Sequence, residues 1–290
     1  EREDEHDEHR GAHACGYNAS KLGSPMSKVL TSVVLRTLVI TINRPEKRNC
    51  VDGETARLLH DAWIRFRDDD ALWVAILTGS GDQAFSAGAD LSDLGGLSAA
   101  VGTTTQQRDA FVQSGPGFLG YTRQTDVYKP IVCAVNGFAL AGGLELMCMG
   151  DIRVVEEHAE MGVACRRWDV PLVDGGTQRL PRIVGMGRAM ELILTGRFID
   201  AAEAKAIGLA NEVVGKGAAL ARAHELAKTL CALPQGAMRA DKKAAMLGWG
   251  TPLAEGLRIE AAAGMTVLGG ADMAEGARAF LEKRSAKFPR

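Results

Sequence analysis

Short runs of consecutive apolar residues predict buried strands in this chain. Three of them, Val74–Thr78, Ile131–Val135 and Ile152–Val155, are rich in β-branched residues and too short to indicate helices. The turn pair Asn136-Gly137 ends the central run. A longer stretch, Val33–Ile42, is rich in Val, Leu, Thr and Ile and predicts a further strand.

Apolar residues at helical spacing predict the other elements. Gly53–Arg67 is amphipathic, and helical patterns dominate after Gly175. The helical stretches expected in that second half are Gly175–Val184, Arg188–Leu194, Ala201–Ile207, Ala218–Leu230, Ala237–Leu247, Pro252–Leu268 and Asp272–Ala286. The chain therefore ends in a region that is helical throughout.

Glycines stand at a junction between a loop and a short helix in the centre of the chain. Ala141-Gly142-Gly143 directly precedes the predicted helix Leu144–Met149. Backbone N–H groups are uncovered at such a junction, and the helix N-terminus adds partial positive charge, which together can bind a negative oxygen. Glu145 places a carboxylate beside this point. The alternative is a tight packing junction where glycine is needed only for lack of room.

A second junction of the same kind follows the strand Val74–Thr78. Residues Ala84–Leu91 again combine small side chains and a glycine before a predicted helix. Two such junctions could bring two N–H donors to one oxygen, which is the design of an oxyanion hole. Each donor is typically worth about 3–4 kcal/mol of transition-state stabilisation.

These two motifs resemble those of the crotonase superfamily, also called the enoyl-CoA hydratase/isomerase family. They read F-S-A-G-A-D and A-V-N-G-F-A-L-A-G-G-L-E-L, and the similarity extends from about Leu30 to the C-terminus. The further matching segments are Ile40–Asn49, Gly175–Gly185, Leu194–Val214 and Phe280–Arg284. The resemblance implies an α/β fold, a crotonase-type spiral of β-β-α turns with a helical C-terminal region.

The same resemblance suggests three parts of the chain and an assembly. Residues 1–25 would be a disordered tail or extension, 26–215 the spiral core, and 216–290 a helical trimerisation region. A homotrimer or a dimer of trimers is expected. The first ten residues hold six acids; three histidines there could bind a metal weakly, but we favour a solvated tail. These histidines are His6, His9 and His13.

The resemblance also assigns candidate site residues. It implies that the backbone N–H groups of Ala89 and Gly142 form the oxyanion hole, with Glu145 as a catalytic carboxylate. Phe118 and Tyr121 could line the acyl pocket, although helix packing explains them equally well. The candidates for binding the substrate and its coenzyme A part are Lys47, Arg48, Ala87, Asp90, Leu91, Cys165, Phe280 and Lys283.

The sequence departs from the hydratase pattern at the second catalytic carboxylate. Cys165 stands where the family has a second glutamate, and a thiol is mostly neutral at neutral pH. Asp174 precedes a glycine pair, as does an active-site aspartate in the dihydroxynaphthoyl-CoA synthases of this superfamily. It could be a second acid/base group, or a helix N-cap. Arg166 and Arg167 could pair with a nearby acid such as Asp169 or Glu145, or bind a carboxylate of the substrate.

Three functions follow from these expectations. The first is a lyase of fatty acid metabolism that hydrates a 2-enoyl-CoA. The second is an isomerase, decarboxylase or thioester hydrolase that uses Glu145 as its single carboxylate. The third is a catalytically weak acyl-CoA-binding protein. In each case a coenzyme A thioester is the ligand and no separate cofactor is expected.

The composition limits the partners and the cellular compartment that the sequence suggests. The net charge of −2 does not indicate binding to nucleic acid or to a membrane surface. No apolar run approaches membrane-spanning length. No histidine pair with ligand spacing indicates a metal site in the folded region. The cysteines form no C-x-x-C pair and are expected to be free thiols in a reducing compartment, the cytoplasm or an organelle matrix. They are Cys15, Cys50, Cys133, Cys148, Cys165 and Cys231.

Overall fold

The computed structural model describes residues 20–22 and 27–288, so most of the predicted tail 1–25 lies outside the described residues. The strands form two sheets. The larger is seven-stranded in the order β1 (Ser20–Leu22), β2 (Val29–Val34), β3 (Thr37–Ile42), β4 (Val74–Gly79), β6 (Ile131–Val135), β8 (Ile152–Glu156) and β11 (Glu212–Val214). The smaller is four-stranded in the order β10 (Phe198–Asp200), β9 (Glu160–Gly162), β7 (Phe138–Leu140) and β5 (Ala84–Ser86).

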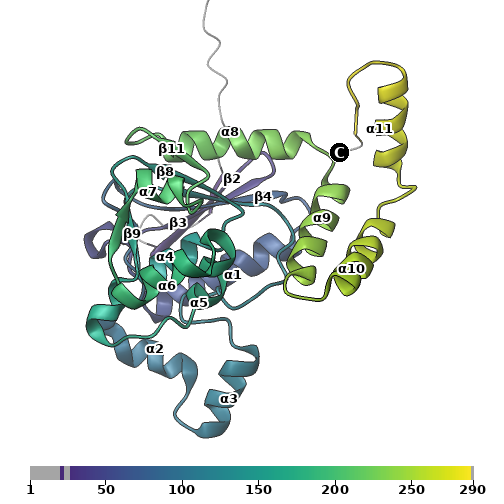
Figure 1. Cartoon of the computed structure of the whole chain (residues 1–290). Helices are drawn as coiled ribbons and strands as arrows, with labels where there is room; N and C mark the ends of the chain where they lie inside the picture. The colour runs from purple at the N-terminus through teal and green to yellow at the C-terminus, as the bar shows by residue number, and fades with distance from the viewer. Residues whose placement is uncertain (1–19, 23–26, 289–290) are drawn as a thin grey trace, which may run out of the picture.

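Helices surround these sheets and extend beyond them (Figure 1). In chain order they are α1 (Gly53–Asp68), α2 (Leu94–Val101), α3 (Thr105–Ser114), α4 (Gly142–Met147), α5 (Gly176–Val184), α6 (Met186–Thr195), α7 (Ala201–Ala206), α8 (Ala219–Ala232), α9 (Gln235–Gly248), α10 (Leu253–Met265) and α11 (Ala271–Leu281). Short 3₁₀ turns occur at η1 (Pro45–Lys47), η2 (Leu91–Asp93) and η3 (Ala164–Trp168).

The chain winds as a spiral between the two sheets. In three successive turns, the first strand joins the large sheet and the second joins the small one, as β4 then β5, β6 then β7, and β8 then β9. Because β5 and β7 are parallel neighbours, the segments that leave their carboxyl ends emerge side by side. This topology confirms the predicted fold class and brings the two glycine junctions to one edge of the small sheet.

Alternation along the central strands sorts their side chains onto two faces. In β4, Val74 and Ile76 pack toward Ala223 and Ala227 of α8, whereas Leu77 faces the main core. Figure 1 shows α8 lying across the sheet. The strand residues are buried on both faces, which is why the sequence shows continuous apolar runs there.

The predicted β stretch Val33–Ile42 is β structure with a turn in it. It holds the end of β2 and all of β3, which pair antiparallel as a hairpin with Val34 opposite Thr37. Leu35 in the turn has φ 56° and is 77% exposed. The turn carries none of the usual glycine, asparagine or proline signals, so nothing in the pattern indicated the break.

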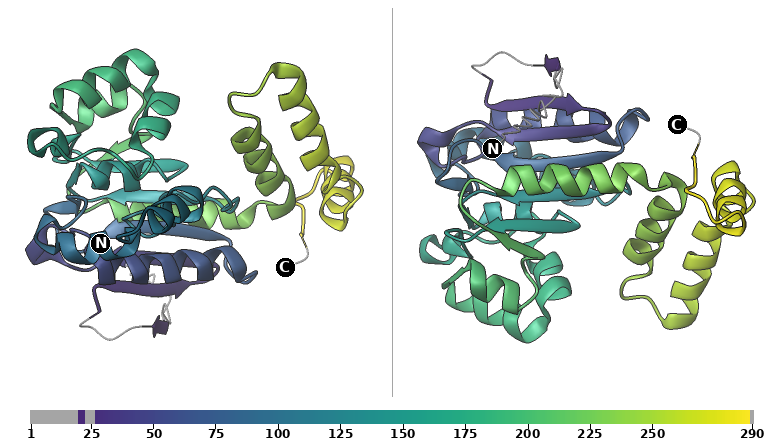
Figure 2. Two further views of the ribbon diagram at one scale, coloured as in Figure 1. Left: turned by 90° about the horizontal axis from the view of Figure 1, so that it is seen from below. Right: turned by 90° about the horizontal axis from the view of Figure 1, so that it is seen from above.

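The predicted C-terminal helices are present, and α10 and α11 end earlier than expected. Helices α9 and α10 pack as a pair beside the core, and α11 lies beyond them (Figure 2). Several large apolar side chains of this region are exposed, among them Leu253, Met265 and Phe280. Such a surface is suited to contacts between subunits. In the described part of the chain, no helix is long and apolar enough to cross a membrane.

Hydrogen bonds of the Asn49 side chain hold the first turn of the spiral together. Its side chain is fully buried, and Nδ2 donates to the carbonyl oxygens of Ser80 (2.9 Å) and Ala84 (2.7 Å). Its Oδ1 accepts from Arg44 N–H at 3.0 Å. The segment that carries Lys47 is thereby fixed to the small sheet.

We expect Asn49→Ala to lower the free energy of unfolding by about 3 kcal/mol, because it leaves buried polar groups without partners. Chemical denaturation would measure the change. Asn43→Ala is the matched control, since half-buried Asn43 makes one bond, to Ser27 O at 2.9 Å, and should cost about 1 kcal/mol. Equal losses for the two variants would contradict this account.

Candidate active site

The two predicted N–H donors lie next to each other. Ala89 forms a parallel bridge with Val51 in which Val51 N–H donates to Gly88 O and Asp90 N–H donates to Val51 O, both at 2.8 Å. The bridge thus uses the groups on either side of Ala89 and leaves the Ala89 N–H facing away from Val51. A Cβ added at Gly142, the first residue of α4, would lie 3.5 Å from Ala89 N.

The glycine pair of this junction serves two separate needs. A Cβ added at Gly143 would lie 1.9 Å from Ser86 O, so Gly143 permits α4 to pack against β5. Gly142 instead faces Gly88 and Ala89, with its N–H in the first turn of α4, where a helix supplies no acceptor. The packing interpretation of the sequence motif thus applies at Gly143, while the oxyanion role of the Gly142 N–H stays a prediction.

Glu145 is held by one of its two carboxyl oxygens. Its Oε1 accepts backbone N–H bonds from Asp174 (2.9 Å) and Gly176 (2.8 Å). No described residue supplies a hydrogen bond to Oε2. The side chain is 3% exposed. One oxygen is thus fixed in place while the other remains available for a substrate or a water.

Burial, with the nearby charge of Asp174, raises the pKa of Glu145 to about 7. The two backbone donors act in the opposite direction because they favour the ionised form. A carboxyl group with this pKa exchanges protons readily near neutral pH, as a general acid or base must.

Asp174 lies beside Glu145, and its side chain turns toward the segment that follows α3. Its Oδ1 accepts hydrogen bonds from Thr122 Oγ1 and, at 3.3 Å, from Leu119 N–H. Burial raises its pKa above the ordinary value. The alternative role as helix N-cap is wrong, because Gly175 occupies that position and no side chain caps α5.

Cys165 is buried in η3, and burial raises the pKa of its thiol. The nearby charge of Glu145 raises it further. The neutral thiol is therefore a polarisable group near Glu145 and is not suited to act as a base. Neither neighbouring arginine forms an ion pair with a described acid: Arg167 stacks over Phe198, with Cζ 4.8 Å from the ring centroid, and Arg166 reaches Val170 O at 3.5 Å.

The expected coenzyme A loop lies beside the donor pair. Ala87 N–H donates to Arg48 O at 3.0 Å, which sets Lys47 and Arg48 against the segment that ends at Leu91. Both basic side chains are exposed. Asp90 is different, because its carboxylate binds Arg44 at 2.8 Å and Ser92 N–H at 3.0 Å. Its side chain is engaged in bracing the loop rather than in facing a ligand.

Phe280 and Lys283 lie far from this site within the chain. Phe280 is 83% exposed at the end of α11, and Lys283 follows that helix. Figures 1 and 2 place α11 beyond α9 and α10, away from α4. The structure therefore does not bring these two residues to the site of the same chain.

The structure adds residues that no motif had indicated. Leu119 covers the donor pair, since its Cδ1 would lie 2.6 Å from a Cβ on Gly142. Arg179 donates to Asp174 O at 3.1 Å, and its charge lowers the pKa of Glu145. Tyr121 is 1% exposed and packs near Trp63, and it also lines a cavity of about 1080 Å³ together with Thr122 and Arg179. Phe118 packs against Phe111.

The described part of the chain comprises residues 20–22 and 27–288. No group of three or more histidine, cysteine, aspartate or glutamate side chains there could hold a metal ion. Cys50, Cys133, Cys148 and Cys165 are free thiols, whereas Cys15 and the three N-terminal histidines lie outside this part of the chain.

The family follows from this fold and from sequence comparison. The enoyl-CoA hydratase/isomerase family model matches residues 36–290. The chain belongs to the enoyl-CoA hydratase/isomerase family, and the crotonase resemblance is confirmed.

Its relatives act on different acyl groups. The chain is 38% identical over 250 residues to a crotonyl-CoA hydratase of Syntrophomonas wolfei, covering 86% of this chain and 93% of the relative. It is 35% identical to a mevalonyl-coenzyme A hydratase of Aspergillus fumigatus, covering 87% and 90%. The solved enoyl-CoA hydratase EchA1 of Mycobacterium marinum has a TM-score of 0.81 at 35% identity, covering 90% of this chain and 98% of that one.

The raised pKa of Glu145 predicts a pH-dependent stability. Between pH 4.5 and about 7 the folded protein holds this proton more tightly than the unfolded chain, so stability falls as pH rises through that window. Glu145→Gln should remove this part of the fall, which amounts to roughly 3 kcal/mol. Denaturation at a series of pH values would measure it, with exposed Glu157→Gln as the control. A Glu145→Gln profile parallel to the wild type would contradict the assignment.

Proposed function

We propose that this protein hydrates a 2-enoyl-CoA thioester. The observation that supports the proposal best is the position of Glu145, a carboxyl with a pKa of about 7, one turn along α4 from the Gly142 N–H. The Ala89 N–H lies next to that group. The names of the similar hydratases point the same way.

Each of these groups acts at a different stage of the proposed hydration. The thioester oxygen takes negative charge when water adds to the β-carbon, and the N–H groups of Ala89 and Gly142 stabilise that charge. Glu145 accepts a proton from the attacking water as the new C–O bond forms. The electron pair of the double bond moves toward the thioester, and a proton then reaches the α-carbon. One C–O and one C–H bond replace the π bond and an O–H bond of water.

Asp174 is the proposed second carboxyl, in place of the glutamate that Cys165 replaces. Burial raises the pKa of Asp174 above its ordinary value, and the charge of Asp174 helps raise the pKa of Glu145. Two neighbouring carboxyls in different environments are a common basis for acid and base roles. In this scheme Asp174 supplies the α-carbon proton.

Double-bond isomerisation is the second candidate, with Glu145 as the only proton carrier. It is favoured by the bonds of Asp174 Oδ1 to Leu119 and Thr122, which hold that carboxyl on the segment after α3. A 1,3-proton shift needs a single group that removes a proton from one carbon and returns it to another.

The ligand and assembly follow from the same proposal. A coenzyme A thioester would bind with its phosphates near Lys47 and Arg48, beside Ala87 and Leu91, and no separate cofactor is required. Phe280 and Lys283 would act on the site of a neighbouring subunit in a homotrimer or a dimer of trimers. In that assembly residues 216–290 form the trimerisation region, and the cytoplasm is the expected compartment.

We expect Glu145→Gln to lower kcat for hydration of crotonyl-CoA by about 10²- to 10⁴-fold while coenzyme A thioesters still bind. Loss of the conjugated thioester absorbance measures the rate. Glu157→Gln, an exposed glutamate, should keep wild-type activity. Hydration that survives Glu145→Gln would refute the proposed mechanism.

Asp174→Asn separates proton transfer from positioning. Asparagine keeps an oxygen that can accept from Leu119 and Thr122, so a positioning role survives, whereas a proton-transfer role is lost. We expect kcat for hydration to fall about 10²-fold with KM little changed. Hydration near the wild-type rate would remove Asp174 from the chemistry. Loss of hydration with retained isomerisation of a 3-enoyl-CoA would favour the second candidate.

Gly142→Ala tests the oxyanion hole. The added Cβ would lie 2.6 Å from Leu119 Cδ1, 3.2 Å from Gly88 Cα and 3.5 Å from Ala89 N, so it crowds the two N–H groups that the proposal assigns to the thioester oxygen. We expect a loss of kcat of about 100-fold or more, comparable with removal of one donor. Gly187→Ala is the control, because no atom lies within 4 Å of the Cβ that it adds. Unchanged turnover in Gly142→Ala would place the hole elsewhere.

A further inference from the structure

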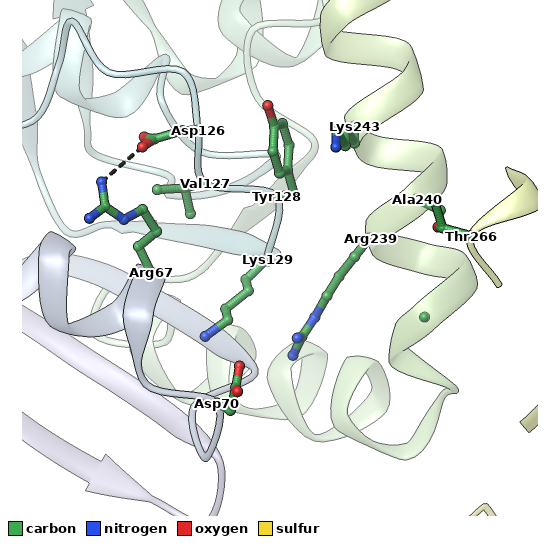
Figure 3. Close-up of a pocket in the computed structure, with 11 residues that line it drawn as sticks. Arg67, Asp70, Asp126, Val127, Tyr128, Lys129, Arg239, Ala240, Lys243 and Thr266 are labelled. Atoms are coloured by element: carbon green, nitrogen blue, oxygen red, sulfur yellow. Dashed lines mark hydrogen bonds and ion pairs between the residues drawn. The ribbon is translucent and has the colours of Figure 1, made fainter. Parts of the chain in front are cut away.

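A basic cavity separates the core from the C-terminal helices. It has a volume of about 340 Å³ and lies between the end of α1, the segment before β6, and α9 (Figure 3). Four cationic and two acidic side chains line it: Arg67, Lys129, Arg239, Lys243, Asp70 and Asp126. Its lining therefore has an excess of two positive charges.

Three of the four cations are already engaged. Arg67 binds Asp126 at 2.8 Å. Lys129 Nζ donates to two carbonyl oxygens at the end of α1 and beyond it, at 2.9 and 2.8 Å. The Lys243 ammonium lies 5.4 Å from the ring centroid of Tyr128. None of these arrangements leaves an ion without a partner.

Arg239 is different. Its Nε and Nη2 atoms are buried, and no residue of the described chain accepts a hydrogen bond from either of them. These two nitrogens lie on the same edge of the guanidinium, the edge that binds two oxygens of one carboxylate or phosphate. Figure 3 shows the guanidinium pointing toward Lys129 and Asp70.

The charges and pKa shifts in the cavity are consistent with an anion-binding site. Burial lowers the pKa of Arg239. Burial also lowers the pKa of Lys129, and the charge of Arg239 lowers it further. Two like charges thus face each other in a partly desolvated space, which is unfavourable unless an anion lies between them. Asp70 is exposed at the rim, and its charge offsets part of these effects by raising the pKa of both groups.

We propose that this cavity binds a phosphate-class oxyanion, with the Nε–Nη2 edge of Arg239 and the ammonium of Lys129 as its main contacts. A dianion matches the excess of two positive charges. The bidentate edge holds two of its oxygens, and Lys129 approaches from the opposite wall. The site is separate from the proposed coenzyme A loop at Lys47 and Arg48, and it does not depend on the proposed reaction.

The bound anion would fasten α9 to the core. Lys129 O already accepts from Lys242 Nζ at 2.9 Å, and Lys242 also binds Asp151 at 2.7 Å. These contacts join α9 to the segment before β6 at one end of the cavity. An oxyanion shared by Arg239 and Lys129 adds a second bridge between the same two parts.

Inorganic phosphate is the probe for this site. The full chain would be melted in chloride and in increasing phosphate at constant ionic strength, and binding would be measured by titration calorimetry. We expect a saturable rise in Tm with phosphate. Arg239→Gln should weaken phosphate binding at least tenfold, whereas Arg258→Gln, an exposed arginine of α10, should leave it unchanged. Asp70→Asn should strengthen binding, because it removes the negative charge at the rim.

Stability without phosphate gives an independent readout. Removing an unpaired, partly buried charge should leave the Tm of Arg239→Gln equal to or above that of the wild type in chloride, and this order should reverse in phosphate. Acetate, a monoanion with the same two-oxygen geometry, should bind more weakly than phosphate.

Other results would overturn the proposal. No saturable effect of phosphate, or an undiminished effect in Arg239→Gln, excludes the site. Equal effects of acetate and phosphate would exclude a site selective for the dianion. If Arg239→Gln destabilises the protein in chloride and reduces its mass in sedimentation, Arg239 binds a carboxylate of a second copy instead.

Discussion

The parallel pairing of β5 with β7 is the constraint on which the rest of this site depends. It brings two segments distant in sequence to the same sheet edge, where Gly88 and Gly142 approach so closely that a Cβ at Gly88 would lie 2.6 Å from Gly142 N. Only small residues can occupy such a contact. The close approach of the two backbone segments therefore requires glycine at these positions. The same approach leaves backbone N–H groups uncovered at the junction, where a reaction can use them.

The electrostatic character of the site comes from opposing effects on a single carboxyl. Burial and the Asp174 charge raise the proton affinity of Glu145, while two backbone donors and the charge of Arg179 lower it. Cys165 adds a thiol with a raised pKa to this cluster rather than a further negative charge. A third carboxylate in so small a space would raise the pKa of Glu145 still more. The neutral thiol thus helps keep Glu145 available as a base near neutral pH.

Much of this architecture could be predicted from the sequence, for identifiable reasons. The doubly buried strands β4, β6 and β8 show as apolar runs, and the glycine junctions show as motifs. The hairpin at Leu35 was missed because its turn lacks the usual residues, and the bracing role of Asp90 was missed because its partner, Arg44, is distant in sequence. Leu119 and Thr122 could not be found at all, since they reach the site only through the path of the segment after α3. The single edge of Arg239 left without a partner is likewise a property of three-dimensional packing.

The two N–H bonds to Glu145 Oε1 come from the backbone of Asp174 and Gly176, on the loop that leads into α5. The base strength of the carboxylate is therefore tied to where that loop sits. With the loop in place, the donors hold the pKa down and the group can be ionised at neutral pH. The same loop also carries the Asp174 carboxylate, whose charge raises that pKa. One short segment thus supplies both the donors that favour the ionised form of Glu145 and the charge that opposes it, so the path of this segment sets the balance between the two protonation states.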